Sequence, residues 1–244
     1  MRYPEVRIAT FINRENRFIA HCELNGEVVT VHVKNTGRGK EVFLPGVHVA
    51  LNYAPGPKRK TDYDLVAVEK AGRWINIDSQ APNKVVMEAY QEGRLKIPGL
   101  PEWTAFRGEV RYRESRIDFW GRTEDERDCW LEVKGVTLEN AGLAAFPDAP
   151  TVRAVKHVHD LITATREGAW AVLLFVIQMS DVDVMTIYQD RAPKLAAAIR
   201  EAQAAGVKIV AYRCEVTPDT LRLATPALVD LDREFKEQVV IQDN

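Results

Sequence analysis

The chain has 244 residues, of which 46% are hydrophobic, and its formal net charge at pH 7 is -2. This length and apolar content are enough to bury a full core in one large domain or two smaller ones, which excludes an intrinsically disordered protein. The three cysteines, Cys22, Cys129 and Cys214, are odd in number and far apart, which excludes a disulfide framework and a clustered zinc site.

The N-terminal residues lack the apolar stretch of a signal peptide, and the longest apolar run, residues 169–177, is too short to span a bilayer. We therefore expect a cytoplasmic protein without a membrane partner. The charge is unevenly placed, because residues 1–80 carry 12 Lys and Arg against 9 Asp and Glu, whereas the remainder carries 21 against 26. Such a difference permits a local phosphate-binding patch without requiring one.

Residues 1 to about 80 show the pattern of short strands separated by turn signals such as Asn25-Gly26 and Pro55-Gly56-Pro57. The expected strands are residues 6–11, 18–24, 27–33, 48–53, 62–69 and 73–77. Closely spaced short strands without a helical period predict a small β-barrel of the OB type, which we assign to residues 1–81.

Two basic loops interrupt these strands, and loops of this kind on an OB barrel often contact a nucleic-acid backbone. The candidate nucleic-acid-binding residues are Lys34, Arg38, Lys40, Lys58, Arg59 and Lys60. The alternative for both loops is a solvated turn whose glycines serve only its geometry.

From Pro82 the pattern changes to strands that alternate with helices, which predicts a mixed sheet with helices on its faces over residues 82–244. The expected helices are residues 83–92, 151–167 and 194–205, and the expected apolar strands are residues 172–177 and 207–212. Gln178 ends the first of these strands, where open α/β sheets place their ligands, although a hydrogen-bonded strand end is an equal alternative. Lys156 and His157 could face a site from the second helix, but solvent is the default expectation.

The segments 115–119 and 130–134 predict two strands of a hairpin. If the hairpin is symmetric about Asp125, Asp118 faces Glu132 with their Cβ atoms about 4.5 to 5.5 Å apart. Two opposed carboxylates repel each other unless a cation lies between them, and Lys134 shares the face of Glu132 because side chains alternate along a strand.

This arrangement has the form of a PD-(D/E)xK nuclease site. Asp118 and Glu132 would hold Mg²⁺ or Mn²⁺, and Lys134 would orient the attacking water or stabilise charge on the phosphate. The alternative is that these are ordinary charges on a solvated strand face.

Motifs in a fixed order resemble the sugar fermentation stimulation protein A family across nearly the whole chain. They are Asn35-Thr36-Gly37-Arg38, Pro57 to Thr61 with Tyr63, Pro82-Asn83, Ser115 to Phe119, Glu132-Val133-Lys134 with Val136-Thr137-Leu138, Phe146 to Ala149, Lys156-His157, and Leu174 to Val176 with Gln178. Gly135 departs from this pattern, since Ser usually follows the lysine, but no proposed metal ligand is missing.

The resemblance implies an N-terminal OB-like domain, a C-terminal domain of PD-(D/E)xK nuclease type, and DNA binding linked to the control of sugar utilisation, notably of maltose. It further implies that Asp118, Glu132 and Lys134 form the nuclease-type triad, with Glu88 as a helix-borne acid and Gln178 as a later strand residue near the site.

Three functions remain open at this point. The first is a DNA-binding protein with a metal-dependent phosphodiesterase site, and the second is a non-catalytic DNA-binding regulator of sugar metabolism genes. The third is an interaction module that acts on proteins of sugar metabolism. The sequence also leaves a homodimer open.

Overall fold

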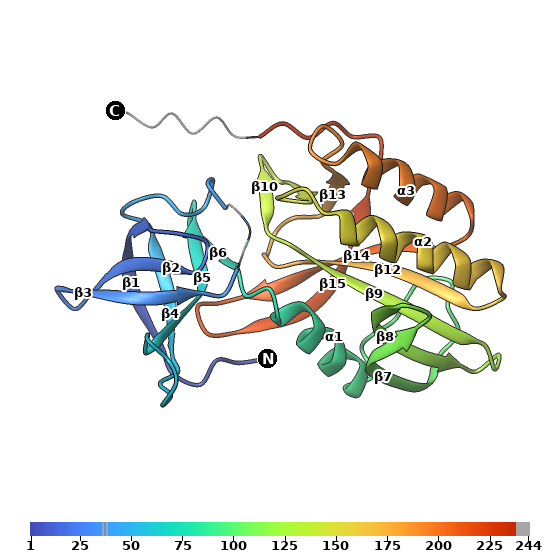
Figure 1. Ribbon diagram of the computed structural model, residues 1–244, viewed down its shortest axis with the longest axis horizontal. Coiled ribbons are helices and arrows are strands. Elements are labelled where there is room, and N and C mark those ends of the chain that lie inside the picture. Colours follow the sequence, from blue (N-terminus) through green and yellow to red (C-terminus); the bar gives the residue numbers. More distant parts are fainter. Residues whose placement is uncertain (36, 38, 238–244) are drawn as a thin grey trace.

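The protein, described here from a computed structural model, consists of two lobes that are each built around one β-sheet (Figure 1). The structure describes residues 1–35, 37 and 39–237. Thr36 and the predicted phosphate contact Arg38 lie outside the described residues.

The N-terminal lobe is a small barrel. Its strands are β1 (Val6–Arg14), β2 (Ile19–Leu24), β3 (Glu27–Val33), β4 (His48–Tyr53), β5 (Tyr63–Lys70) and β6 (Arg73–Asn76). They pair in the order β3-β2-β1-β4-β5-β6, and a further parallel pairing of β3 with β5 closes the first five strands into a barrel. The prediction of an OB-like N-terminal barrel is confirmed.

The C-terminal lobe contains a mixed nine-stranded sheet in the order β10-β11-β13-β15-β14-β12-β9-β8-β7. The strands are β7 (Trp103–Tyr112), β8 (Ser115–Thr123), β9 (Asp128–Val136), β10 (Leu138–Asn140), β11 (Leu143–Phe146), β12 (Trp170–Ile177), β13 (Val184–Ile187), β14 (Lys208–Val216) and β15 (Leu221–Val229). Strand β12 lies parallel to both β9 and β14, which explains why its sequence is apolar throughout.

Three helices cover this sheet: α1 (Ala81–Gln91), α2 (Val152–Arg166) and α3 (Pro193–Ala204). Alternate residues of β12 pack into two different cores. Leu174 packs with residues of α1, whereas Leu173 packs with residues of α2 and α3, so the helices lie on opposite faces. The predicted mixed sheet flanked by helices is confirmed.

The ends of the helices follow local sequence signals. Thr151 caps α2, because its side chain accepts a hydrogen bond from the backbone N–H of Ala154, and Gly168 follows the helix with a φ of 94°. Helices α1 and α3 each have a proline in the first turn, where no intrahelical N–H bond is lost.

The two lobes share backbone and core contacts. The N–H of Asn76 in β6 donates to the carbonyl of Gln178 at 2.9 Å, and Ile75 forms an isolated bridge with Met179. One cluster of buried apolar residues contains Leu51 and Leu65 of the barrel together with Phe175 and Ile177 of β12. The boundary at residues 81/82 stays a prediction, since α1 begins at Ala81.

Two expectations drawn from composition can be compared with the structure. Cys22, Cys129 and Cys214 are all buried and free, as their spacing predicts. Within the described residues, no helix is long and apolar enough to cross a membrane.

Candidate metal-dependent nuclease site

The hairpin β8–β9 has the predicted register. Phe119 lies opposite Leu131 and Trp120 opposite Trp130, as symmetry about Asp125 requires. Asp118 and Glu132 occupy the next positions along the two strands, and the backbone N–H of Asp118 lies 3.4 Å from Glu132 Oε2. The strands are longer than expected, because the turn takes only residues 124–127.

The Asp118 carboxylate is held by two donors from different elements. Its Oδ2 accepts a hydrogen bond from the backbone N–H of Val133 at 2.8 Å, and its Oδ1 accepts one from the Asn83 amide of α1 at 2.9 Å. Burial raises the pKa of Asp118, and the nearby negative charge of Glu132 raises it further. The carboxyl group therefore retains its proton to a higher pH than an exposed aspartate does.

The Glu132 carboxylate is almost fully buried, with 2% of the residue exposed. Its Oε1 is contacted by the Lys134 ammonium group and by the Nδ1 of His157. Burial alone would raise its pKa, but the hydrogen bond from His157 and the charge of Lys134 together outweigh burial, so the pKa of Glu132 is lowered. Two adjacent carboxyl groups thus have pKa values shifted in opposite directions, as acid and base pairs in active sites often do.

His157 belongs to this site although it was expected to face solvent. The Nε group of Arg153 donates to Nε2 of His157 at 3.3 Å, so Nδ1 must carry the ring hydrogen and donate it to Glu132. A signal for this placement was present in the sequence. His157 is spaced three residues from Ala154 and four from Leu161, both of which are buried on the inner face of α2.

Glu88, which was predicted as a helix-borne acid of the site, does not join these residues. Its carboxylate contacts the N-terminal nitrogen of Met1, which also donates to the carbonyl of Leu221 in β15 at 2.6 Å. Glu88 lies five positions after Asn83 in the helix, which places the two side chains about 140° apart around the helix axis. Helix α1 therefore contributes Asn83, and not Glu88, to the contacts around Asp118.

Gln178 lies beside the end of β9 and joins the two lobes. Its Nε2 donates to the carbonyl and side-chain oxygens of Asn76 at 3.1 and 2.9 Å, and to the carbonyl of Asp78 at 3.1 Å. A Cβ at Gly135, the residue after Lys134, would overlap Gln178 Oε1 and approach Pro82 Cγ to 2.9 Å. The lack of a side chain at Gly135 is what lets Gln178 fit there.

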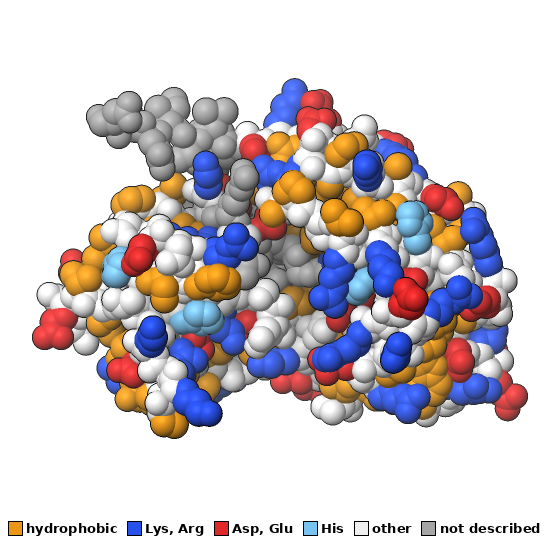
Figure 2. Space-filling view, in the orientation of Figure 1, with side chains coloured by type: hydrophobic (Ala, Val, Ile, Leu, Met, Phe, Trp, Pro, Cys, Tyr) orange, Lys and Arg blue, Asp and Glu red, His pale blue; other side chains and the backbone are white. Residues whose placement is uncertain are grey.

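A cavity of about 190 Å³ opens between the lobes at the carboxyl ends of β9 and β12. Its lining includes Asn35, Ser79, Gly135, Asp148 and Gln178. The space-filling view shows the hollow between the lobes, with Lys and Arg side chains along its right-hand edge (Figure 2). Gln178 thus lines a cavity where such sheets commonly bind ligands.

The two carboxylates supply the oxygen ligands that Mg²⁺ and Mn²⁺ prefer. Among the described residues, no group of three or more His, Cys, Asp and Glu side chains is arranged to hold a metal ion. An ion held by Asp118 and Glu132 alone would need water or phosphate oxygens as its other ligands, as Mg²⁺ commonly has in phosphoryl-transfer sites.

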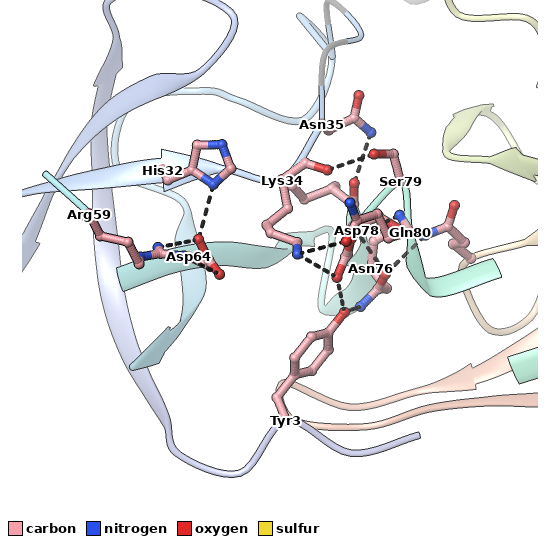
Figure 3. A network of polar contacts seen from close by, with 12 residues as sticks. Tyr3, His32, Lys34, Asn35, Arg59, Asp64, Asn76, Asp78, Ser79 and Gln80 are labelled. Carbon is pink, nitrogen blue, oxygen red and sulfur yellow. Dashed lines mark hydrogen bonds and ion pairs between the residues drawn. The ribbon is translucent and has the colours of Figure 1, made fainter. Parts of the chain in front are cut away.

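The predicted phosphate contacts that the structure describes form two groups, those with a salt bridge to an acid and those without one. Lys34 lies 3.6 Å from Asp78 and 3.4 Å from Gln80, and Arg59 pairs with Asp64 at 2.6 Å (Figure 3). Lys40, Lys58 and Lys60 are exposed, and within the described part of the chain none of the three has an ion pair. Lys34 and Arg59 are thus fixed in position by buried acids, while the three lysines are free to neutralise phosphates.

Comparisons with known proteins cover both lobes. Residues 12–77 match the family model described as the SfsA N-terminal OB domain, and residues 80–220 match that of the sugar fermentation stimulation protein RE domain. Two relatives named sugar fermentation stimulation protein homolog are similar over nearly their full lengths. The protein of Lacticaseibacillus casei (strain BL23) is 48% identical over 97% of this chain and 98% of its own, and that of Enterococcus mundtii is 46% identical over 97% and 99%.

A solved structure described as Pyrococcus furiosus SfsA in complex with Ca²⁺ has the same fold. It superposes with a TM-score of 0.83 at 27% sequence identity, and the match covers 95% of this chain and 98% of that one. The likeness extends over both the barrel and the nine-stranded sheet.

Proposed function

This chain belongs to the sugar fermentation stimulation protein family, and we propose that it binds DNA and hydrolyses phosphodiester bonds with a divalent metal ion held by Asp118 and Glu132. The observation that carries this proposal is the convergence of two partly or fully buried carboxylates and the Lys134 ammonium group on one hairpin. The Ca²⁺ of the Pyrococcus furiosus relative supports a divalent cation at this fold, with Mg²⁺ or Mn²⁺ as the expected catalytic ion.

Each residue of the site has a role in this proposal. Asp118, oriented by Asn83 and the backbone of Val133, and Glu132, oriented by His157, bind the ion. When bound, such an ion lowers the pKa of a coordinated water and polarises the scissile phosphate. Lys134 orients the attacking water or stabilises the negative charge that develops on the phosphate oxygens.

The barrel supplies the binding surface for the nucleic-acid backbone. Lys40, Lys58 and Lys60 contact phosphates, while Lys34 and Arg59 are held in place by Asp78 and Asp64. Replacement of Lys58 and Lys60 by alanine should weaken DNA binding and reduce its salt dependence, because fewer counterions are released on binding.

The test is cleavage of single-stranded DNA, duplex DNA and RNA by purified protein with Mg²⁺ or Mn²⁺. Asp118→Asn should abolish cleavage while DNA binding survives. Asp128→Asn is a matched control, because Asp128 is a surface acid on the same hairpin that pairs with Arg122. Intact substrates with every metal would refute the catalytic part of the proposal.

A non-catalytic DNA-binding regulator of sugar metabolism genes, notably those for maltose, is the second candidate. One observation favours it: the charge of Glu132 is already balanced by Lys134, and His157 donates a hydrogen bond to the same carboxylate, which allows the carboxylate to be stable without a metal. This function predicts equal DNA affinity with and without divalent ions, and no effect of Asp118→Asn on that affinity.

A further inference from the structure

A recess on the barrel lies apart from the carboxylate pair. It has a volume of about 120 Å³ and is lined by Phe18, His32, Val33, Lys34, Asn35, Ser79 and Gln80. The space corresponds to about four water molecules at ~30 Å³ each, which suits one small planar group and not a folded partner. Phe18, at its edge, exposes 47% of its surface although it is a large apolar residue.

The exposure of Phe18 is imposed by a well-fixed backbone. The Asn16 side chain accepts hydrogen bonds from the N–H groups of Phe18 and Ile19 at 2.9 and 3.1 Å, and the Phe18 carbonyl accepts one from Val33 at 2.7 Å. Arg14 also donates to the carbonyl of Arg17 at 2.7 Å. The backbone that carries the aromatic ring is thus ordered before any ligand arrives, which lowers the entropy lost on binding.

The polar side of the recess is fixed by two acids that are themselves buried. Asp64, with 6% of its surface exposed, accepts a hydrogen bond from His32 at 3.0 Å and pairs with Arg59. Asp78, with 0% exposed, holds Lys34. Figure 3 shows Arg59, His32 and Lys34 arranged in sequence along this face, each directed toward one of the two carboxylates.

The recess adjoins the cavity between the lobes. Asn35 and Ser79 line both spaces, and the cavity is also lined by Gly135, the residue that follows Lys134. A strand bound at Phe18 would therefore meet Asn35 and Ser79 next and then the cavity at the end of β9, where Gly135 follows Glu132 by three residues within the same strand.

We propose that this recess binds one unpaired base of single-stranded nucleic acid, which stacks on Phe18 while its backbone runs through the inter-lobe cavity toward Asp118 and Glu132. The proposal rests on the nucleic-acid binding proposed above and narrows its substrate to strands with unpaired bases. A base within a duplex has both faces covered by its neighbours and cannot stack on Phe18. An aromatic side chain can stack with any base. The recess therefore selects single-stranded over double-stranded nucleic acid and does not select a base sequence.

The test compares Phe18→Leu, Phe18→Ala and Phe18→Trp with the wild type in binding a fluorescent oligothymidylate and a blunt DNA duplex. Loss of one stacked base weakens single-strand binding by about 5- to 150-fold. Phe18→Leu and Phe18→Ala should show this loss, and Phe18→Trp should retain affinity. Duplex binding should be unchanged in all three variants. Since Phe18 is half exposed, near-identical circular dichroism spectra and melting temperatures are expected.

The salt dependence separates stacking from charge. Phe18→Leu should lower affinity without changing the slope of log K against log salt concentration, whereas the Lys58→Ala/Lys60→Ala variant should reduce that slope. If the wild type binds neither probe, both this inference and the proposed function fail. If the wild type binds the oligonucleotide and Phe18→Leu binds it equally well, only this inference fails.

Discussion

The Nδ1 of His157 hydrogen-bonds the carboxylate of Glu132 and so ties helix α2 to strand β9 at the proposed metal site. Residues that orient a metal ligand typically change metal affinity or activity about 10- to 100-fold when they are replaced. We expect His157→Leu to weaken Mn²⁺ binding by this amount. His157→Asn should retain more affinity, because the Asn amide nitrogen can occupy the position of Nδ1.

Isothermal titration with Mn²⁺ checks this prediction, and urea denaturation of the same variants separates orientation from folding. His159→Leu serves as a control, since His159 lies on the same helix with its side chain half exposed. Equal Mn²⁺ affinity in wild type and His157→Leu would show that His157 has only a packing role.

The pKa of Asp118 predicts an effect of pH on stability. The pKa of Asp118 in the folded protein lies above that of an exposed aspartate, so the stabilising contribution of this group is fully present below the ordinary aspartate pKa and is lost as the pH rises through the folded pKa. Asp118→Asn removes the ionisable group, and with it the stability lost when Asp118 ionises. The metal-free variant should therefore melt at a higher temperature than the wild type at pH 7 and at a similar temperature at pH 3.5.

Scanning calorimetry at these two pH values, with EDTA present, makes the comparison. Addition of Mn²⁺ at pH 7 should stabilise the wild type and not the variant, because ligand binding to the folded state shifts the unfolding equilibrium. A lower melting temperature for metal-free Asp118→Asn at pH 7 would contradict the prediction.

Glu139 of β10 links the lobes through Lys70 at 3.1 Å and Arg73 at 2.9 Å, both from the barrel. Burial alone would raise its pKa, but the N–H of Gly142 and the two cations outweigh burial and lower it. The stabilisation is therefore present above pH 4.5 and is lost as the pH falls through the folded pKa. Glu139→Gln should lower the free energy of unfolding by about 1–3 kcal/mol at pH 7.

Urea denaturation at pH 7 and at the lowest pH at which the protein stays folded measures this difference, which should shrink in acid. Glu126→Gln, at an exposed position in the β8–β9 turn, should be neutral at both pH values. A difference that is the same at both pH values would show that the charge of Glu139 does not contribute.

Gly135 and Gln178 should be energetically coupled. A Cβ at position 135 overlaps the Gln178 side chain, and overpacking of this kind typically costs about 1–3 kcal/mol. Gly135→Ala should destabilise the protein, and Gln178→Ala combined with it should destabilise by less than the sum of the two single changes.

A double-mutant cycle by chemical denaturation measures this coupling. Gly108→Ala is a matched control on strand β7, because its Cβ would make only an ordinary contact of 3.5 Å with Phe119. Additive effects of Gly135→Ala and Gln178→Ala would show that the two positions do not share space.

Local patterns were sufficient to predict several parts of the structure. The assumption of a hairpin symmetric about Asp125 predicted the register, and the burial of Phe119 and Leu131 explains why it holds, since a shift by one residue would move them out of the core. The apolar run of β12 indicated a strand buried on both faces, and turn residues marked the strands of the barrel.

Other parts depend on tertiary packing that local patterns do not contain. Strand β7 was not expected, because five of its ten residues are exposed and its burial pattern shows no regular alternation. Glu88 was assigned to the site from the family resemblance, whereas the rotation of α1 decides that Asn83 contacts Asp118. The pairing of Lys34 with Asp78 requires residues distant in sequence to meet.

The hydrogen bonds from Gln178 to Asn76 and Asp78 join the barrel to the large sheet. Movement of the two lobes apart around a ligand would break these buried hydrogen bonds. The ligand must therefore fit the inter-lobe cavity as it stands. Duplex DNA resists bending over roughly 150 base pairs, whereas an unpaired strand turns freely at each nucleotide. If the protein binds nucleic acid as proposed above, such a joint favours a strand that bends easily rather than a stiff duplex.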